Sequence, residues 1–375
     1  MKVFDILPPA SPRHGFHRTV SSWVDAALVE FGPEGTMNYA QMSIPGEYDN
    51  LFTTGMEESQ IIFGDTDHLE ACIREVDRQK QPKLLFVTSS PVSEIIGADL
   101  RFLCRGLQPE IRAKLTVWDS VPMEGTEEDG RSHAFRLAAE FVSTLPAAEK
   151  KGLLVLGLDQ TDYNGISDLN ELRRMAFDYF SLPCLNDAFG RYRLTDLTQA
   201  ACILTVDPAA EPLAEAARRL WGTPWCSGLC YGLEQARETV SGLERCLGAA
   251  PSTRWQEDLE SARRVRDRFL RLARNSRRCR IHLCQEPSRA GAMERLLTCL
   301  GLSCDLPQDP CHGTWGKSDI LVGSGVLCGL FPDSPSFCVA YPGIRQYPIG
   351  EHCPYMGVQG EEILLAELSG ILPTV

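Results

Sequence analysis

The sequence lacks long hydrophobic runs: no uninterrupted apolar stretch approaches the ~18 residues that a membrane-spanning helix needs. Residues 1–12 also lack the apolar segment that is typical of a secretory signal. With 43% hydrophobic and 23% charged residues, the composition is that of an ordinary globular chain. We therefore expect a cytoplasmic protein without a membrane span.

Positive charge is also in short supply. Lys and Arg number 37 against 50 Asp and Glu, and the formal net charge of -13 repels nucleic acid. Residues 252–280 are the exception, because they are rich in arginine and are predicted to form one long helix. We interpret this helix either as a docking surface for an acidic partner or as a solvated helix whose charges nearby carboxylates such as Glu257 and Asp267 offset.

Common nucleotide and hydrolase motifs are missing. Residues 313–318 end in Gly-Lys-Ser like a phosphate-binding loop, but Cys311 stands where that loop needs a glycine. A strand rather than a helix is predicted to follow, over residues 319–323. The chain also has no Gly-x-Gly-x-x-Gly after a strand, no Gly-x-Ser-x-Gly and no His-Glu-x-x-His. These absences leave nucleotide-binding, serine-hydrolase and zinc-protease functions without support.

Closely spaced cysteine pairs are absent as well. The fifteen cysteines are scattered, and none form the Cys-x-x-Cys pairs of metal and redox motifs. An odd number of dispersed cysteines fits reduced thiols in an anoxic or reducing compartment better than a disulfide framework. We interpret Cys202 and Cys284, which lie within apolar runs, as core residues.

What the sequence does contain is a series of short apolar runs, with helical patterns between them. The runs cover residues 83–88, 114–118, 152–157, 201–206, 280–284, 319–323 and 337–341. Continuous apolar strands that alternate with helices are typical of parallel sheets covered on both faces, so the predicted fold class is α/β. We predict three Rossmann-like lobes with parallel sheets, over residues 1–147, 148–250 and 251–375.

Several spaced segments carry a resemblance to a known family. They read Phe-Gly-Pro-Glu-Gly at residues 31–35, Leu-Phe-Thr-Thr-Gly-Met-Glu-Glu at 51–58, Ile-Ile-Phe-Gly at 61–64, Ser-Pro-Val-Ser-Glu-Ile-Ile-Gly-Ala-Asp at 90–99 and Pro-Tyr-Met-Gly-Val-Gln-Gly at 354–360. In order and spacing they resemble the component 1 family of nitrogenases and nitrogenase-like oxidoreductases. The resemblance covers nearly the whole chain, and it implies a fold of the nitrogenase component 1 type.

The resemblance also implies an iron–sulfur cluster that loops of two homologous subunits share, with thiolates as ligands. This chain departs from that pattern. The family's cysteine after the turn that ends at Gly35 is Thr36, and its cysteine in the loop before Glu94 is Pro91. No cysteine occurs in residues 11–17, where a third thiolate belongs. Gly35, Thr36, Pro91 and Glu94 are therefore the predicted residues of a degenerate cluster site.

Two further implications concern metal ligands. His14 and His17 are candidates to replace the lost thiolates, since imidazole ligates iron in some [2Fe–2S] centres; the alternative is that both are surface histidines of an N-terminal arm. An iron–molybdenum-type cofactor is not expected, because the resemblance aligns Thr205 or Val206 with the family's cysteine ligand and Met356 with its histidine ligand.

The remaining cofactor or redox candidates are Cys226, Cys230 and Cys353. Cys226 and Cys230 lie in a segment that is predicted to be a loop opening a helix at Tyr231, where a helix N-terminus lowers a thiol pKa. By the resemblance, Cys353 faces the family's cofactor cavity. For all three residues the alternative is a thiol that packs as a small hydrophobe.

The sequence supports two main hypotheses about function. The first is a component 1-like oxidoreductase subunit that accepts electrons from a separate ATP-dependent iron–sulfur reductase, with Glu94 and Asp99 either delivering protons or capping helices. The second is a cluster-free scaffold or assembly subunit that pairs with a cysteine-bearing homologue. A third option is a small-molecule binding protein.

The expected partners follow from the resemblance. They are a homologous component 1-type subunit, in a homo- or hetero-oligomer, and a nitrogenase reductase-like iron protein. Any iron–sulfur cluster is expected to be shared with the partner subunit. The substrate stays undetermined.

Overall fold

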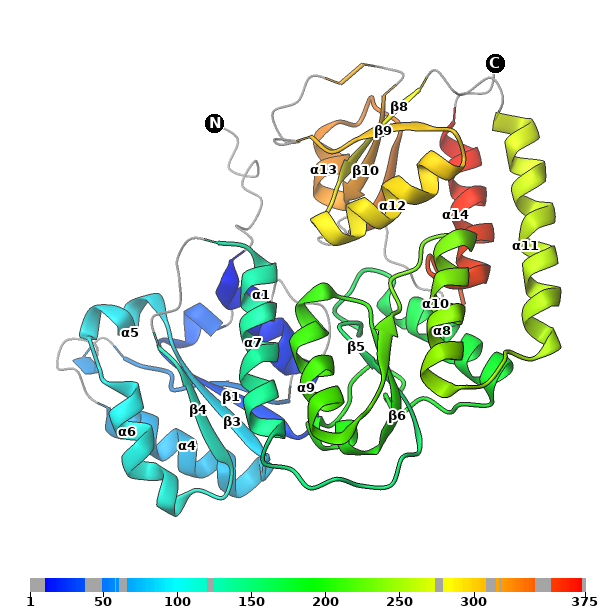
Figure 1. Ribbon diagram of the computed structural model, residues 1–375. Coiled ribbons are helices and arrows are strands. Elements are labelled where there is room, and N and C mark those ends of the chain that lie inside the picture. The colour runs from blue at the N-terminus through cyan, green and yellow to red at the C-terminus, as the bar shows by residue number, and fades with distance from the viewer. Residues whose placement is uncertain are drawn as a thin grey trace. The chain divides into compact units, whose positions relative to one another are not determined.

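The computed structural model describes residues 11–37, 49–57, 59–60, 66–119, 125–273, 279–307, 315–316, 319–340 and 352–372. The chain is an α/β protein with three parallel sheets, as predicted (Figure 1). Residue contacts divide it into two compact units. Unit 1 is Met1–Lys150, Arg191–Ala200 and Ala209–Thr223, and unit 2 is Lys151–Gly190, Ala201–Pro208 and Pro224–Val375. None of the described helices combines the length and the hydropathy that crossing a membrane requires.

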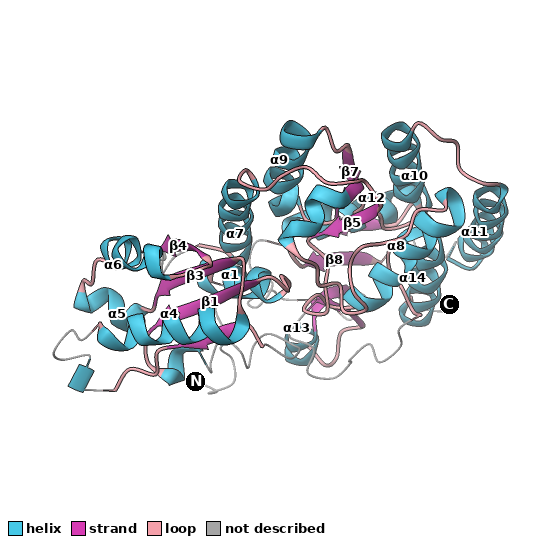
Figure 2. Ribbon diagram, turned by 90° about the horizontal axis from the view of Figure 1, so that it is seen from below, coloured by secondary structure: helices cyan, strands magenta, loops and turns pink. Residues whose placement is uncertain are grey.

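Unit 1 is built on a four-stranded parallel sheet with the strand order β2-β1-β3-β4. Figure 2 labels its strands β1, β3 and β4. Its strands are β1 (Ala26–Phe31), β2 (Leu51–Thr53), β3 (Leu84–Ser89) and β4 (Lys114–Trp118). Its helices are α1 (Pro12–Ser21), α4 (Asp67–Lys80), α5 (Pro91–Ile96), α6 (Leu100–Leu107), α7 (Glu127–Val142) and α9 (Glu211–Trp221). The central strands β1 and β3 are buried over their whole length, as expected of strands covered on both faces.

The two faces of this sheet pack against different helices. On one face, α4 and α6 bury apolar side chains of β1 and β3. On the other face, the ring of Phe86 lies 5.2 Å from that of Phe16 on α1 and 6.0 Å from that of Trp23. Helix α1 also packs on α7 so closely that a Cβ on Gly15 would lie 2.0 Å from the Glu127 carbonyl oxygen. Only glycine permits this approach.

Unit 2 contains the other two sheets, with the strand orders β5-β6-β7 and β11-β10-β8-β9. The strands are β5 (Gly152–Leu156), β6 (Ala200–Thr205), β7 (Trp225–Ser227), β8 (Arg280–Cys284), β9 (Ser303–Asp305), β10 (Ile320–Ser324) and β11 (Ser336–Ala340). The helices are α8 (Gly165–Phe180), α10 (Leu233–Leu247), α11 (Thr253–Leu272), α12 (Pro287–Cys299), α13 (Gly325–Leu330) and α14 (Gly357–Ile371). Helix α11 runs beside α14 (Figure 1).

All seven predicted strands are present, each within one residue of its predicted bounds, whereas β1, β2, β7 and β9 escaped prediction. The prediction of a helix over residues 252–280 is wrong at its end. Helix α11 stops at Leu272, residues 274–278 lie outside the described part of the chain, and Arg280 begins β8, where it pairs with Ser303. The segment is a strand and not the end of a helix because three consecutive residues of β8 are buried. The three lobe boundaries stay predictions.

Candidate functional site

Two loops that carry the resemblance follow adjacent strands of the unit 1 sheet. One follows β1 and begins at Gly32, and the other follows β3 and begins at Ser90. The Ser90 N–H donates to the Phe31 carbonyl at 3.1 Å. A Cβ on Gly32 would lie 2.4 Å from Ser90 Oγ, so glycine is required where the two loops touch. The loops meet at the carboxyl edge of the sheet, where α/β proteins bind ligands. The predicted segment at residues 61–64 lies outside the described residues.

Pro91 is exposed and is the first residue of α5. Ser90 and Ser93 form a capping box at this helix start, with hydrogen bonds of 3.1 and 2.8 Å. Glu94 is not a cap, because its carboxylate accepts from the hydroxyl of the last β3 residue at 3.0 Å. Asp99 does cap α6, by accepting from the third N–H of that helix at 2.9 Å. The second loop therefore forms the starts of α5 and α6, and Pro91 has no side-chain atom that could ligate a metal.

The first loop directs Thr36 toward the interior of unit 1. The Thr36 hydroxyl lies 2.7 Å from Oε1 of Glu30, a fully buried residue of β1. Gly35 is exposed, and a Cβ there would meet nothing within 4 Å. Gly35 therefore makes no close approach to the described residues of this chain, and Thr36 is already engaged with a carboxylate.

Glu30 is the centre of a buried polar network. Its carboxylate is 0% exposed and forms a two-point ion pair with Arg13 of α1, whose Nε donates to Oε2 at 2.6 Å. His17, one helical turn further along α1, is also 0% exposed and places Nε2 3.4 Å from the same oxygen. Among the described residues, neither ring nitrogen of His17 has a hydrogen-bond partner. We call Arg13, His17, Glu30 and Thr36 the Glu30 network.

Burial and charge determine the protonation states in this network. Burial raises the pKa of Glu30, although the charge and hydrogen bonds of Arg13 oppose that rise. Burial lowers the pKa of His17 well below its usual value, and the nearby Arg13 charge lowers it further. Since the guanidinium also repels a metal cation, the network fits a carboxylate held by its own counter-ion and not a metal centre.

The alternative that both histidines of α1 lie at the surface is wrong for His17, and a ligand role for either histidine stays a prediction. His17 is not a surface residue, because its side chain is fully buried. His14 is half-buried, and its Nδ1 lies 2.9 Å from Oε1 of Glu127 on α7. Burial raises the pKa of Glu127, but the His14 hydrogen bond and the Arg18 charge outweigh burial and hold that pKa at about 2. His14 thus helps to fasten α1 to α7.

The residues aligned with the family's cofactor ligands do not fit an iron–molybdenum-type cofactor. Thr205 is the last residue of β6 and has no nitrogen or sulfur ligand atom. Met356 is 0% exposed, and its N–H donates to Oδ1 of Asp168 at 2.9 Å. A threonine and a buried methionine thus replace a cysteine and a histidine, which leaves such a cofactor without its usual anchors.

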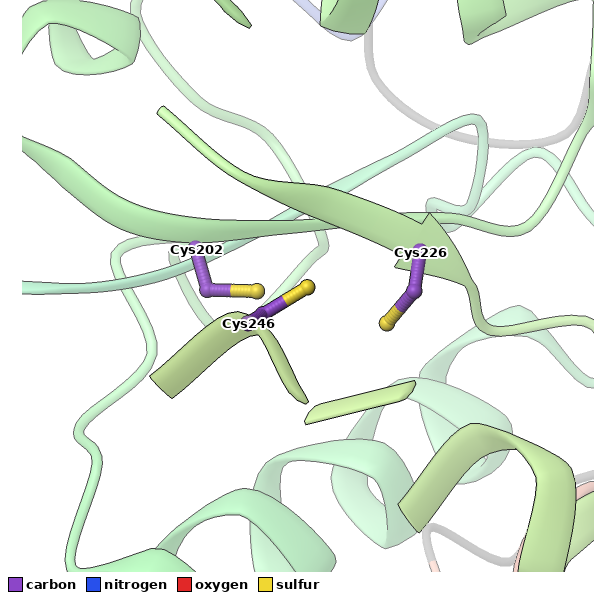
Figure 3. A group of neighbouring side chains, drawn as sticks. All are labelled: Cys202, Cys226 and Cys246. Carbon is purple, nitrogen blue, oxygen red and sulfur yellow. The ribbon is translucent and has the colours of Figure 1, made fainter. Parts of the chain in front are cut away.

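Unit 2 brings together cysteines that lie far apart in the sequence. The sulfur atoms of Cys202 on β6, Cys226 on β7 and Cys246 in α10 lie within 4.8 Å of one another and converge on the same space (Figure 3). We call these residues the cysteine triad. Of the three predicted thiol candidates, only Cys226 belongs to it. Cys230 is buried in the core, and Cys353 is exposed.

The predicted lowering of the Cys226 and Cys230 pKa values by a helix N-terminus is wrong. Cys226 lies in a strand, and α10 begins only at Leu233. The Cys202 thiol lowers the pKa of Cys226, but the hydrogen bond to Cys246 and burial raise it to about 12. Burial raises the pKa of Cys230 to about 12. Hydrogen bonds from the other two triad thiols instead lower the pKa of Cys246.

Sequence reasoning missed three important residues. Arg13 and Glu30 had a weak signal in the sequence. Glu30 is a lone carboxylate inside an apolar run, and a helix with basic residues four positions apart precedes it. Cys246 had none, because its nearness to Cys202 and Cys226 comes from strand register and helix packing and not from spacing along the chain.

Comparisons with known proteins agree with the resemblance. A family model described as "Nitrogenase component 1 type Oxidoreductase" matches residues 11–304. The solved structure "Nitrogenase Cp1 at pH 6.5" is similar with a TM-score of 0.73 at 13% identity, covering 97% of this chain and 92% of that chain. At this low identity the likeness shows the fold alone.

Curated proteins with significant similarity include two named "Nitrogenase iron-molybdenum cofactor biosynthesis protein NifE". The one from Clostridium pasteurianum is 23% identical over 235 residues, or 60% of this chain and 50% of that protein. The one from Klebsiella pneumoniae is 23% identical over 263 residues, or 65% and 54%. A protein with the corresponding name NifN, from Bradyrhizobium diazoefficiens, is 28% identical over 142 residues, or 36% and 29%. This chain thus spans about half the length of the NifE proteins.

Proposed function

Because this chain belongs to the nitrogenase component 1 type oxidoreductase family, we propose that it is a scaffold or assembly subunit that holds no iron–sulfur cluster through its own loops. The observation that carries this proposal is the Glu30 network. A buried ion pair lies beside the junction of the two loops, where Thr36 and Pro91 provide no thiolate.

The ion pair argues against a cluster at this junction on energetic grounds. A cluster needs thiolate ligands, whereas Pro91 has no ligand atom and the Thr36 hydroxyl is engaged by Glu30. Separating Glu30 from Arg13 to make room would leave a buried charge without its partner, at a cost of about 3–5 kcal/mol. The two loops keep their backbone turns, but the polar groups beside their junction pair with one another and need no metal ion.

The names of the relatives support an assembly role. Both NifE and NifN are named as cofactor biosynthesis proteins and not as catalytic subunits. A subunit that takes part in building a cofactor needs a surface for its partner and need not keep a redox centre of its own. We therefore favour assembly over catalysis for this chain.

We propose that its partner is a homologous, cysteine-bearing component 1-type subunit. Ile95 on α5 and Phe102 on α6, close to the second loop, are 87% and 70% exposed. Two large exposed apolar side chains on neighbouring helices beside this loop make a small apolar surface that a partner subunit can cover. A shared cluster or cofactor would then be ligated by the partner's thiolates.

A second candidate function is the oxidoreductase subunit itself. The family description favours it, and the chain has no phosphate-binding loop of its own, which fits electron supply by a separate ATP-hydrolysing, reductase-like iron protein. In that case the electrons would enter a cluster held by the partner subunit.

Anaerobic purification tests these proposals. The chain is isolated alone and co-expressed with a component 1-type homologue, and each sample is analysed for iron and acid-labile sulfide and by electron paramagnetic resonance. We expect no stoichiometric iron in the isolated chain and iron only in the complex. Stoichiometric iron and sulfide in the isolated chain would exclude the cluster-free subunit.

The complex then separates the two functions. A reductase-like iron protein with ATP and dithionite should leave the spectrum of an assembly complex unchanged within seconds, whereas an oxidoreductase should become reduced on that time scale. The variant Thr36→Val tests the loop itself. It should leave the iron content of the complex unchanged, because we expect Thr36 not to ligate iron.

A further inference from the structure

We propose that the cysteine triad is a binding site for one divalent, thiophilic metal ion of the zinc class. The site lies in unit 2 and uses Cys202, Cys226 and Cys246 as its three protein ligands. It is independent of the loop junction in unit 1 and of the proposed assembly role. A structural or regulatory ion in this position would tie a helix to the edge of a sheet.

Strand register places two of the sulfurs on the same face of the sheet. In the parallel pairing of β6 with β7, Leu204 lies opposite Cys226. Cys202 is two residues before Leu204, and side chains two residues apart in a strand point to the same face. Cys202 and Cys226 are therefore diagonal neighbours on the face that α10 covers.

The third ligand comes from α10, and a glycine in this helix creates the space for the site. A Cβ on Gly242 would lie 2.9 Å from both the Sγ and the Cβ of Cys226, so the Cys226 side chain occupies the room that a side chain at 242 would take. Cys246 is four residues after Gly242, one turn along the same helix face. The missing side chain thus lets the strand approach α10 and brings the Cys226 sulfur near that of Cys246.

The distances between the sulfurs fit one ion and not a cluster. Bonds of about 2.3 Å to a tetrahedral zinc ion separate two thiolate sulfurs by about 3.8 Å. The triad sulfurs already lie within 4.8 Å of one another, so a contraction of about 1 Å or less completes the coordination. In a [4Fe–4S] cluster each thiolate ligates a different iron atom, and in a [2Fe–2S] cluster no more than two thiolates share one iron, so three mutually close sulfurs fit a single ion better.

The electrostatic surroundings also favour a cation. Cys246 lies in the last turn of α10, whose C-terminal end carries partial negative charge and attracts positive ions. Three thiolates around a divalent ion leave a net charge of -1.

Binding is an acid–base exchange without a redox step. Three thiols lose three protons to solvent as three sulfur–metal bonds form, so affinity rises with pH. Among the described residues no further Cys, His, Asp or Glu joins the group, so the fourth position is available to water or to an added ligand.

Metal titration of the full-length chain tests this proposal. The reduced, chelator-treated protein is titrated anaerobically with Co²⁺, and sulfur-to-cobalt charge-transfer absorption in the near ultraviolet reports thiolate ligation. We expect saturation at one Co²⁺ per chain and displacement of the band by one equivalent of Zn²⁺. Absence of this band would overturn the proposal.

Matched variants identify the ligands. Cys226→Ala and Cys246→Ala should each weaken Zn²⁺ binding at least about 100-fold, since even loss of a supporting contact costs 10–100-fold. Cys304→Ala is the control, because Cys304 is likewise a partly buried thiol packed against the same core. If Cys304→Ala weakens binding as much as the triad variants, the assignment is wrong.

A measurement on the unaltered protein covers the case in which a triad variant fails to fold. The reduced chain is treated with iodoacetamide with and without one equivalent of Zn²⁺, and alkylation of each cysteine is read by peptide mass spectrometry. We expect Zn²⁺ to protect Cys226 and Cys246 at least tenfold and to leave Cys299, which is exposed, unprotected. Equal alkylation of Cys226 and Cys246 in both samples would refute the site.

Discussion

Replacing Arg13 is the most direct test of the Glu30 network. Arg13→Met removes the guanidinium but keeps an unbranched apolar stem, so Glu30 stays buried without its counter-ion. Removing one partner of a buried pair typically destabilises a protein by about 3–5 kcal/mol. Glu30 is 0% and Arg13 15% exposed, so water can replace little of the lost interaction. We expect a loss of this size at neutral pH.

The same variant should recover part of its stability in mild acid. Folded Glu30 has a raised pKa, so the folded state binds its proton more tightly than the unfolded state does. A raised carboxyl pKa therefore makes folding more favourable as pH falls through the folded pKa toward the ordinary value. Without Arg13 the pKa rises further, so the deficit of Arg13→Met relative to the parent should shrink between pH 7 and pH 5.

Local hydrogen exchange measures the effect where it occurs. Exchange of the β1 amides, residues 26–31, is followed by mass spectrometry over a series of urea concentrations at both pH values. Arg78→Met is the matched control: it breaks the Arg78–Glu75 pair, whose side chains are 68% and 50% exposed, and should change β1 protection little. The double variant Arg13→Met/Glu30→Leu should be more stable than Arg13→Met alone, because apolar replacement removes the unpaired charge.

Two outcomes would refute this reasoning. If Arg13→Met cost less than about 1 kcal/mol at pH 7, the ion pair would not be a substantial part of the network's stability. If the double variant were less stable than Arg13→Met, the cost would come from lost packing and not from an uncompensated carboxylate.

Three further predictions follow from other contacts. Gly242→Ala on α10 should destabilise unit 2 by about 1–3 kcal/mol, because the new Cβ collides with a triad cysteine. The control is Gly291→Ala on α12, where a Cβ meets nothing within 4 Å, and it should be neutral or stabilising by about 0.5–1 kcal/mol. Urea unfolding measures both variants, and equal effects would contradict the collision. His17 is buried with a lowered pKa, so below the ordinary value near 6.5 the unfolded state binds a proton that the folded state does not. The free energy of unfolding should therefore decrease by up to about 1.4 kcal/mol per pH unit below that value. Urea unfolding at pH 7.5 and 5.5 should show a smaller decrease for His17→Gln than for the parent, and an equal decrease would contradict this role of His17. Ile95→Asp should weaken the affinity for the component 1-type subunit at least tenfold, measured by light scattering or titration. Phe177→Asp, at an exposed apolar residue of unit 2, should leave that affinity unchanged. An unchanged affinity for Ile95→Asp would remove α5 from the interface.

Much of the fold was predictable because most strands are buried on both faces and are therefore continuous apolar runs. The exceptions have physical reasons. β1 contains Glu30, a carboxylate that is buried only because Arg13 pairs with it, and a charged residue disguises a core strand. β2, β7 and β9 are three-residue strands at sheet edges, too short to leave a periodic signal.

The candidate sites were less predictable. The loss of thiolates at Thr36 and Pro91 could be read from the resemblance, but nothing in the sequence indicates that an ion pair lies beside the loop junction. Cys226 was predicted for a reason that is wrong, namely closeness to a helix N-terminus. Its partner thiols lie on the neighbouring strand β6 and at the C-terminal end of α10. Such contacts depend on tertiary packing, which a local pattern does not encode.

The close packing of α1 on α7 sets an order of events during protein synthesis. His14 and Glu127 are 113 residues apart in the chain. At about 5–20 residues per second, α7 leaves the ribosome roughly 6–23 seconds after α1. Until then the surface of α7 that receives Gly15 does not exist. A ribosome-bound fragment that ends before α7 should therefore present the face of α1 that carries Gly15 to solvent, where a chaperone can reach it.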